Sequence, residues 1–473
     1  MNLLPPQAWP GLLSKTARLA IVPFAIAVGA CGGGAGDTSV APPVATSIAP
    51  NSSTSLTAMA GDGVAELPSV IVKDQRGAAM VGVPVAFLLA SGGGTIRGKP
   101  LTTNASGVAT LGGWSLGTVP GSNSVTVSAS GLAPVMFVAI GTASNVASVL
   151  LPTLGGSFSV AYAINDGGVV VGYSTDNSDA TPFAVRWTPT SSGSWSITPI
   201  AAADSWALRI NVNGTAVGMR AGRVKLWPAT GGELDLGTGE PNGINGAETV
   251  VGIRRNPNDP GEQHALVWRK PSTGWDPLAT HAPQDLPLFP GGTGWTSAKA
   301  INDAGIIAGT VGVSTGTSTY YAVRWDPVGD LWAQPIALPG TGGFDVTAAR
   351  AINDKPQADL AGGARKCFSC LSFGMAWLGG SAGTSLESSW GGGGPGFVDG
   401  INNAQRVVGT RDAATSSEQH AFVWWPGRTS VHVLAHPGYT YTWAYDINNL
   451  SPAQAVGYGL DANGTRAIVW TIP

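Results

Sequence analysis

The sequence predicts an all-β chain in which a β-sandwich precedes a seven-bladed β-propeller closed by an N-terminal strand. Three observations support this prediction. A unit recurs along residues 163–470, its pattern is that of strands and turns, and the two ends of the repeat region complement each other. The composition agrees, because 68 glycines and only 11% charged residues among 473 are typical of a turn-rich β protein.

The repeated unit has three landmarks: an Ile-Asn pair, a later glycine and a final tryptophan. The asparagines are Asn165, Asn211, Asn245, Asn302, Asn353, Asn402 and Asn448. The glycines are Gly172, Gly218, Gly252, Gly309, Gly362, Gly409 and Gly457. The tryptophans are Trp187, Trp227, Trp268, Trp325, Trp377, Trp424 and Trp470. Repeats of this length indicate a solenoid, a propeller or an array.

Each unit carries the chemistry of short strands joined by tight turns. In the first unit, three valines at 169–171 follow Asn165 and Asp166, and such a β-branched run beside turn-forming residues predicts a hairpin. No unit contains a helical stripe. A further apolar segment, such as residues 196–200, separates each tryptophan from the next Ile-Asn pair. Four strands per unit correspond to one propeller blade, and the repeated tryptophan is expected to pack between blades.

The ends of the repeat region predict how the ring closes. Only three residues follow Trp470, so the seventh unit lacks its fourth strand. Residues 149–154 form an unmatched strand ahead of the first unit. This strand is expected to complete the last blade, which would leave no open sheet edge.

The N-terminus has the features of an export signal, assigned to residues 1–30. Lys15 and Arg18 precede an apolar segment at 19–30 that is too short to span a bilayer. The segment ends in Val-Gly-Ala-Cys, which resembles a bacterial lipobox with Cys31 as the lipid-modified, palmitate-carrying residue. A plain signal peptide with a chance cysteine is the alternative. We expect an exported protein anchored by lipid at the cell surface, in the outer membrane if the cell is Gram-negative.

Residues 31–45 are rich in Gly, Ala, Ser, Thr and Pro and read as a flexible tether. Residues 46–143 are expected to form a separate β-sandwich domain. Its predicted strands are 69–73, 83–89, 107–111, 124–128 and 135–140. The domain resembles the bacterial Ig-like domains of invasin- and intimin-type surface proteins, with the likeness carried by residues 72–77, 82–87, 91–95 and 103–109. The resemblance implies a spacer or adhesive module without chemistry.

The propeller is assigned to residues 144–473. Residues 263–268 and 419–424 read Gln-His-Ala-Leu/Phe-Val-Trp, which resembles the His-Ala-Phe signature of the HAF family of extracellular repeats. The Ala-Ile-Asn-Asp and Val-Val-Gly elements are similar to that family too. The fifth unit departs most, with Lys355, Pro356 and Gln357 in its turn. The resemblance implies an extracellular repeat scaffold and no defined activity.

Cys367 and Cys370 lie in a loop of the fifth unit and are compatible with a disulfide, a redox pair or half of a metal site. The disulfide is favoured, because a thioredoxin-type motif needs a strand-to-helix context and zinc needs two further ligands. The Asn-Asp pairs of several units could ligate calcium, but no short segment supplies the six to eight oxygens that calcium takes. A turn-forming role is therefore expected for these pairs.

No catalytic, phosphate-binding or nucleotide-binding motif is present, so we predict no catalytic residue, cofactor or metal site. Four loop carboxylates, Asp276, Asp285, Glu262 and Glu418, stay open as candidates, because sequence alone does not show whether two of them meet. The net charge of −3 offers no basic footprint for nucleic acid. No apolar run after the N-terminal segment is long enough to span a bilayer.

The longest connection between units, residues 271–297, is the candidate ligand-binding segment. Its aromatic and polar residues suit sugar rings or protein hot spots. The candidates are Trp275, His281, Asp285, Phe289 and Trp295. The alternative is a loop that covers the edge of a blade.

We therefore expect a non-enzymatic binding or adhesion scaffold, whose partners are a glycan or a surface protein and, through its lipid, the membrane. An extracellular polysaccharide-active enzyme is the alternative, since fold alone does not decide function. Two carboxylates, or a histidine and a carboxylate, converging in one pocket would favour the enzyme.

Overall fold

The computed structural model describes residues 41–60, 63–98, 101–117, 120–142, 146–256, 259–276, 281–314, 318–339, 346–366, 371–380, 382–386, 396–412, 418–428 and 431–473. These residues form strands and turns and no helix, which confirms the all-β prediction. None of them forms a helix long and apolar enough to cross a membrane. Cys31, Cys367 and Cys370 lie outside the described residues, so lipidation and the disulfide stay predictions.

Residues 45–142 form two main sheets. The first is three-stranded, in the order β1 (Ala45–Pro50), β3 (Ser69–Asp74) and β7 (Val108–Thr110). The second is five-stranded, in the order β2 (Ser55–Met59), β10 (Val135–Thr142), β9 (Gly121–Ala129), β4 (Pro84–Ser91) and β6 (Leu101–Thr102). A short ribbon pairs β5 (Thr95–Arg97) with β8 (Gly113–Ser115). The five strands predicted here are all present.

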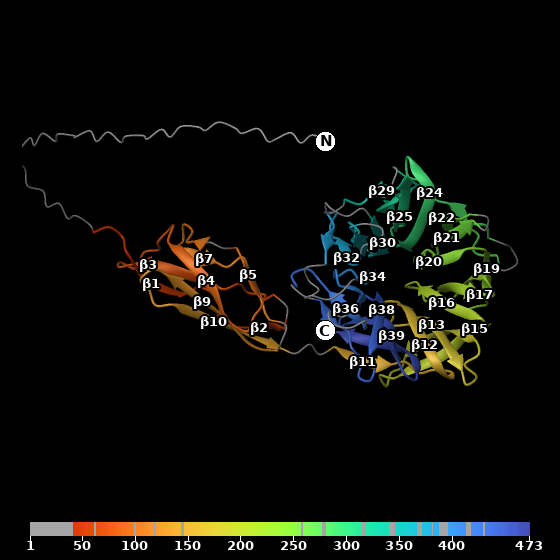
Figure 1. Ribbon diagram of the computed structural model, residues 1–473, viewed down its shortest axis with the longest axis horizontal. Coiled ribbons are helices and arrows are strands. Elements are labelled where there is room, and N and C mark those ends of the chain that lie inside the picture. Colours follow the sequence, from red (N-terminus) through yellow and green to blue (C-terminus); the bar gives the residue numbers. More distant parts are fainter. Residues whose placement is uncertain are drawn as a thin grey trace, which may run out of the picture. The chain divides into compact units, whose positions relative to one another are not determined.

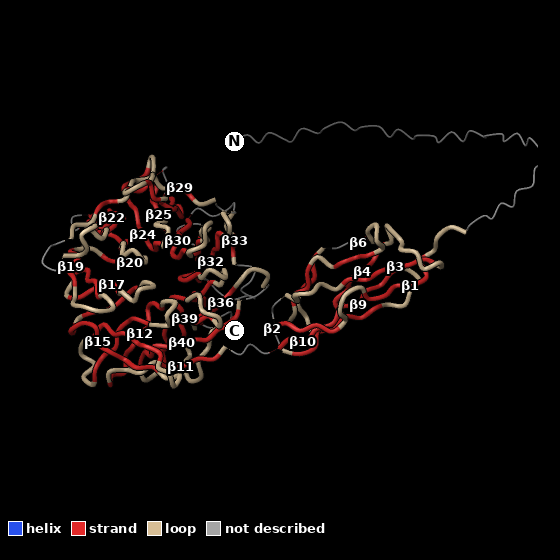
Figure 2. Tube along the Cα trace, turned by 180° about the vertical axis from the view of Figure 1, so that it is seen from behind, coloured by secondary structure: helices blue, strands red, loops and turns tan. Residues whose placement is uncertain are grey.

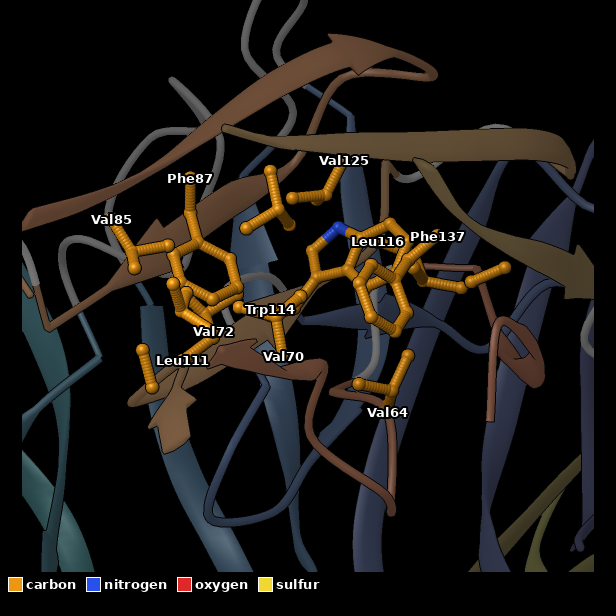
Figure 3. Packing of buried hydrophobic residues seen from close by; sticks show 13 residues of the cluster. Val64, Val70, Val72, Val85, Phe87, Leu111, Trp114, Leu116, Val125 and Phe137 are labelled. Atoms are coloured by element: carbon orange, nitrogen blue, oxygen red, sulfur yellow. The ribbon is translucent and has the colours of Figure 1, made fainter. Parts of the chain in front are cut away.

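One hydrophobic core joins these sheets (Figure 3). Val70 and Val72 on β3 and Phe87 on β4 are buried, and Trp114 and Phe137 lie beside them. On β3 and β4, buried and more exposed positions largely alternate, as expected where one face of a strand packs on a core.

Residues 147–472 form successive antiparallel meanders, one per unit (Figures 1 and 2). Single parallel pairings, Phe158 with Thr465 and Tyr320 with Val346, join two pairs of units into larger sheets. We number the seven units by their asparagines. Unit 1 consists of β12 (Gly155–Ile164), β13 (Val170–Asp176), β14 (Pro182–Pro189) and β15 (Trp195–Ala203). Unit 2 consists of β16 (Ser205–Ile210), β17 (Ala216–Arg220), β18 (Arg223–Trp227) and β19 (Leu234–Gly237). Unit 3 consists of β20 (Glu240–Ile244), β21 (Val250–Asn256), β22 (Asp259–Trp268) and β23 (Gln284–Asp285).

Unit 4 consists of β24 (Gly292–Ile301), β25 (Ile307–Ser314), β26 (Ser318–Trp325) and β29 (Ile336–Ala337). Unit 5 consists of β30 (Val346–Ile352), β31 (Leu360–Arg365), β32 (Ser372–Trp377) and β33 (Thr384–Ser385). Unit 6 consists of β34 (Gly396–Ile401), β35 (Val407–Asp412), β36 (Gln419–Trp424) and β37 (His432–Val433). A small ribbon of β27 (Pro327–Val328) and β28 (Leu331–Trp332) decorates unit 4. Unit 7 contributes β38 (Tyr441–Ile447), β39 (Ala453–Asp461) and β40 (Gly464–Ile472).

The strand next to β40 comes from the N-terminal end of the repeat region. β11 (Ala147–Leu150) pairs antiparallel with β40, from Ala147 opposite Thr471 to Leu150 opposite Ile468. The backbone N–H of Leu151 continues this pairing and donates to the carbonyl of Ala467. Successive four-stranded meanders whose first strands surround one pocket are the architecture of a β-propeller.

The side chain of the repeated asparagine forms hydrogen bonds both within its own unit and to the next unit. Asn165 Oδ1 accepts hydrogen bonds from the N–H groups of Gly167 and Val169 in its own turn, which is the expected turn role. Its Nδ2 donates to the carbonyl of Asn211 in unit 2, at 3.1 Å. The other six asparagines repeat both bonds, and Asn448 Nδ2 donates to the carbonyl of Asn165. The series of bonds thus returns to its first member.

In five of the seven units the repeated tryptophan donates its indole N–H to the segment before its own unit, as expected for packing between units, whereas Trp227 and Trp424 donate within their own units. Trp268 is buried, and its indole N–H donates to the carbonyl of Leu236 at the outer strand of the preceding unit, at 2.8 Å. Trp325, Trp377 and Trp470 make the equivalent bond to the segment before their own unit. Trp187 makes it to Pro152, directly after β11.

A third link between units is made by the backbone of the alanine in the His-Ala-Phe element. The backbone N–H of Ala265 in unit 3 donates to the buried hydroxyl of Thr296 in unit 4, at 2.8 Å. Four other seams carry the same bond to a serine or threonine, and one of them runs from Ala467 in unit 7 to Ser159 in unit 1. Gly239 and Gly396 occupy this position in units 3 and 6, so two seams lack the hydroxyl.

Candidate functional site: the central pocket

An open pocket with an empty volume of about 950 Å³ lies where the first strands of the units meet. All seven units line it, each with the end of its first strand or the turn that follows. Because the asparagines, glycines and tryptophans of the repeat are committed to holding the units together, the chemistry of this pocket depends on positions at which the units differ.

Each first strand carries a β-bulge three residues before its asparagine. In unit 1, Ala161 is opposite Gly172 and Ala163 is opposite Val171, so Tyr162 is the extra residue. The other six units show the same register shift at the same place. A bulge bends its strand and re-aims a side chain, and bulges are frequent beside binding sites. The bulged residues are Tyr162, Leu208, Asn242, Lys299, Arg350, Asp399 and Tyr445.

The repeated glycine is what allows this bulge. A Cβ atom on Gly172 would overlap the carbonyl oxygen of Val160 on the neighbouring first strand. The equivalent glycine of every other unit would collide in the same way with the carbonyl five residues before the asparagine. Only glycine permits two backbones to approach so closely. The repeat therefore keeps one backbone shape at the pocket while the bulged side chain varies.

Basic side chains of the pocket lining come from units 2 and 5, and Lys299 of unit 4 lies at its own bulge outside that lining. Arg350 and Arg209 line the pocket, and Arg209 stands where most units have alanine or glycine. Arg350 Nη1 lies 2.6 Å from Asp399 Oδ1, and its guanidinium sits over the ring of Phe397. Burial, followed by the charges of Arg350 and Arg209, lowers the pKa of Lys299 to about 8.

Two carboxylates line the pocket on units 6 and 7. Asp399 is the ion-pair partner of Arg350. Asp446 accepts hydrogen bonds from the N–H groups of Ile164 in unit 1 and of Ile447. Burial raises the pKa of Asp446 to about 6, although these bonds and the charge of Arg209 oppose the rise. Two carboxylates therefore converge in one pocket, which is the feature that sequence analysis required for an enzyme.

Aromatic side chains gather where unit 7 meets unit 1. The Tyr162 ring lies 5.4 Å from that of Tyr445 and 6.1 Å from that of Tyr173. Trp443 stacks on Tyr458 with ring centroids 4.5 Å apart. Burial raises the pKa of Tyr162 to about 12 and also raises that of Tyr445, so these phenols stay protonated near neutral pH and can donate hydrogen bonds.

At the pocket rim, the residue that follows the asparagine forms a further hydrogen bond between neighbouring turns, but only in some of the units. Asp303 Oδ1 accepts the N–H of Gly246, and Asp354 Oδ1 accepts the N–H of Asp303. Asp166 accepts both the N–H and the side-chain amide of Asn449. Burial raises the pKa of Asp354. These carboxylates link neighbouring turns through the bonds just described. The described residues contain no group of three metal-ligating side chains.

The candidate residues of the 271–297 connection are distributed over separate contacts. The rings of Trp275 and His281 lie 4.7 Å apart in an edge-to-face arrangement, and Trp275 also donates to Glu248. Asp285 lies on β23 and pairs with Arg254 at 3.0 Å. The Asp285 carboxylate is therefore already neutralised.

The remaining two candidates pack on the third strand of unit 4. Phe289 lies 6.4 Å from Tyr321, and it packs against the core cluster of units 3 and 4. Trp295 contacts Tyr320 edge-to-face at 5.0 Å. The structure thus brings Trp275 and His281 together and leaves the other three candidates in separate contacts. The four loop carboxylates named from sequence do not line the central pocket.

Sequence reasoning missed the bulged residues. The available signal appears when the seven units are aligned on their asparagines. The position three residues before the asparagine then includes tyrosine, lysine, arginine and aspartate, which interrupt apolar strands. A bulge leaves the landmark spacing within the strand unchanged, so the pattern itself did not reveal that these side chains are re-aimed.

No protein-family model and no curated protein matches this chain. Among solved structures, it is similar to the β-propeller domain of the trilobed protease from Pyrococcus furiosus, with 11% identity and a TM-score of 0.43 over 66% of this chain and 95% of that one. The PQQ-bound aldose sugar dehydrogenase from Streptomyces coelicolor gives 9% identity and a TM-score of 0.34 over 70% and 99% of the two chains. Trypanosoma rangeli sialidase gives 10% identity and a TM-score of 0.33 over 68% and 55%. These similarities assign no activity to this chain.

Proposed function

We propose that this chain is a surface-displayed binding protein whose central pocket binds a glycan. The observation that carries the proposal is the set of seven bulges, because four of the bulged residues, Asn242, Arg350, Asp399 and Tyr445, belong to the pocket lining and differ from unit to unit. Aromatic rings with a few placed polar groups suit sugars, whose rings have apolar faces and hydroxyl edges. Asn242 and Tyr445 supply such groups.

The scaffold of this proposal is a closed seven-bladed propeller. Its support is the pairing of β11 with β40 and the return of the asparagine bonds from Asn448 to Asn165. In the same proposal, residues 46–143 are an Ig-like spacer, residues 31–45 are a tether, and lipid on Cys31 anchors the protein at the cell surface. The disulfide between Cys367 and Cys370 belongs to this proposal as well.

Glycan binding is tested by screening the exported chain against a glycan array and measuring the hits by calorimetry. Tyr445→Ala is expected to weaken binding at least about tenfold, because stacking and one hydrogen bond are lost together. Trp275→Ala is the matched control, since it removes an aromatic ring of the 271–297 connection. Loss of binding with Trp275→Ala and retention with Tyr445→Ala would move the site to that connection.

A polysaccharide-active enzyme is the second candidate, and the observation that favours it is the convergence of Asp399 and Asp446 in the pocket. A carboxyl group whose pKa is raised to about 6 is suited to donate a proton. If the pocket is catalytic, the bound glycan will be shortened over time and Asp446→Asn will abolish this cleavage while retaining binding. An intact glycan after prolonged incubation would exclude hydrolysis of that ligand.

The lipid anchor is tested separately. Cys31→Ser is expected to block labelling by palmitate and to release the protein from the membrane fraction. Labelling that persists in the variant would place the lipid on another residue.

A further inference from the structure

A second cavity, with an empty volume of about 540 Å³, lies at the seam between units 5 and 6. We call it the seam cavity. Its polar and aromatic lining comes from Arg365 and Ser372 of unit 5 and from Phe397, Thr410, Asp412 and Gln419 of unit 6. These residues are distinct from those that line the central pocket. The volume is within the range of sites that hold small molecules.

Glycines at two repeat positions help to open this seam. Gly396 stands where five units have the serine or threonine hydroxyl, and Gly374 stands where five units have the alanine that donates to it. A Cβ atom on Gly396 would overlap the carbonyl oxygen of Thr410 on the second strand of the same unit. The two strands of unit 6 therefore approach too closely here for a side chain that could reach toward unit 5.

A shortened side chain on unit 5 opens the seam further. Ser372 stands where units 3 and 6 have glutamine. The corresponding Gln263 is buried and donates across its own seam to the carbonyl of Thr296, at 3.3 Å. Ser372 Oγ instead accepts a hydrogen bond from Arg365 Nε of its own unit, at 2.6 Å. Ser372 thus leaves space that a glutamine fills at the seam between units 3 and 4.

The lining of the seam cavity is polar and balanced in charge. Its described residues include one cation, Arg365, and one carboxylate, Asp412, whose Oδ1 accepts the side-chain amide of Gln419 at 2.9 Å. Thr410 is 2% exposed, and its hydroxyl has no hydrogen-bond partner among the described residues. Because buried polar groups in proteins are normally hydrogen-bonded, this hydroxyl and the space beside it suit an occupant that carries hydrogen-bonding groups.

We propose that the seam cavity is a second ligand site, which binds one uncharged sugar residue. One cation and one carboxylate in the same lining favour a neutral ligand over an acidic or an amino sugar. Hydroxyl, amide and carboxylate groups match the hydroxyls of a sugar, and the Phe397 ring matches an apolar face of the sugar ring. The site does not depend on glycan binding in the central pocket. Water alone is the alternative occupant.

The probes are the methyl glycosides of glucose, galactose and mannose, each compared with its uronic acid and its 2-amino sugar. Calorimetry and ligand-observed NMR on the full chain are expected to show one neutral probe binding with a Kd of about 1 mM or lower, and at least about tenfold more tightly than its charged counterparts. Failure of every probe to bind would leave water as the occupant and overturn the site. Tighter binding of a charged counterpart would overturn the neutral class.

Ser372→Gln should abolish this binding, because it restores the side chain that units 3 and 6 carry and fills the space. Thr410→Val keeps the side-chain shape and should weaken binding about tenfold, through the loss of one hydrogen bond. Thr310→Val is the matched control, since Thr310 is the buried residue at the same position of unit 4. Thermal unfolding checks that each variant is folded.

Tyr445→Ala, in the central pocket, should leave binding at the seam unchanged. A sugar that is lost in Tyr445→Ala and retained in both Ser372→Gln and Thr410→Val would lie in the central pocket. That result would overturn the seam site and support the function proposed for the central pocket.

Discussion

At the scale of single residues, one asparagine side chain in every unit both shapes a turn and bonds to the next unit. In unit 4, Asn302 Oδ1 accepts the N–H of Ile306, and Asn302 Nδ2 donates to the carbonyl of Asn353, at 3.0 Å. The side chain is only 3% exposed, so its partners cannot turn to water when it is removed. The residue therefore shapes a turn and joins two units at once.

Substitutions of Asn302 should separate these two jobs. Asn302→Ala removes both bonds and is expected to lower the free energy of unfolding by about 2–4 kcal/mol, because buried partners are left unsatisfied. Asn302→Asp keeps the acceptor in the turn but buries a carboxylate and turns one of its oxygens toward the carbonyl of Asn353, so at neutral pH a loss at least as large as for Ala is expected. Denaturant unfolding measures both, with Asn463→Ala on an exposed turn as the control. A clearly smaller loss for Asp than for Ala would show that the contact with unit 5 contributes little.

The depressed pKa of Lys299 predicts a pH dependence of stability. The folded-state pKa of about 8 lies below the ordinary lysine value of 10.5, so the unfolded chain binds the proton more tightly between these values. Stability from this group should therefore rise as the pH increases from about 8 to about 10.5. Unfolding measured across this window should show the rise in the native chain and a flatter profile in Lys299→Met. A slope identical in the two proteins would be inconsistent with this assignment.

At the scale of the element, the bulged first strand and the glycine opposite it form one device. Gly309 lies against the carbonyl of Ser297 and the ring of Trp325. Lys299 is the extra residue of the bulge in this unit. A different side chain can be placed at the bulge of each unit without a change in the strands that carry it.

Gly309→Ala should disrupt this device. The new methyl group would overlap a backbone carbonyl, so the strands must separate, and a loss of about 1–3 kcal/mol or more is expected from overpacking. Gly232→Ala is the control, because a Cβ atom there meets nothing within 4 Å. Chemical denaturation gives both values, and comparable stability of the two variants would argue against a steric need for glycine at the bulge.

At the scale of the whole molecule, the links between units matter because each unit alone is a thin sheet. The Nδ2 bonds of the asparagines, five of the seven indole bonds and the alanine-to-hydroxyl bonds run between neighbours, and all three kinds have a member joining unit 7 or β11 to unit 1. The β11 strand has only four residues, but it lies where these three kinds of contact join the last unit to the first.

Replacing residues 147–152 of the full chain with Gly-Ser should lower the midpoint of thermal unfolding by several degrees. The change removes the buried Leu151 side chain and leaves β40 as an unpaired edge. Replacing the exposed turn 191–193 in the same way is the control. A midpoint equal to that of the control would mean that β11 does not support the last unit.

The sequence by itself determined the all-β class, the repeat, the strands of residues 45–142 and the packing role of the tryptophans. These follow from local chemistry, because turn residues, β-branched runs and a large aromatic at fixed spacing act within one unit or between adjacent ones. The spacing before unit 1 also pointed to a strand there, and β11 lies at that place beside β40.

Only the tertiary structure decided which side chains share the central pocket. Asn242, Arg350 and Tyr445 lie far apart along the chain, and each lies in a strand whose pattern reads as ordinary packing. They come together because the bulges re-aim side chains and the units are arranged around one opening, and neither effect leaves a trace in local periodicity. The 271–297 connection drew attention because its sequence is unusual, whereas the pocket is built from small departures at a repeated position.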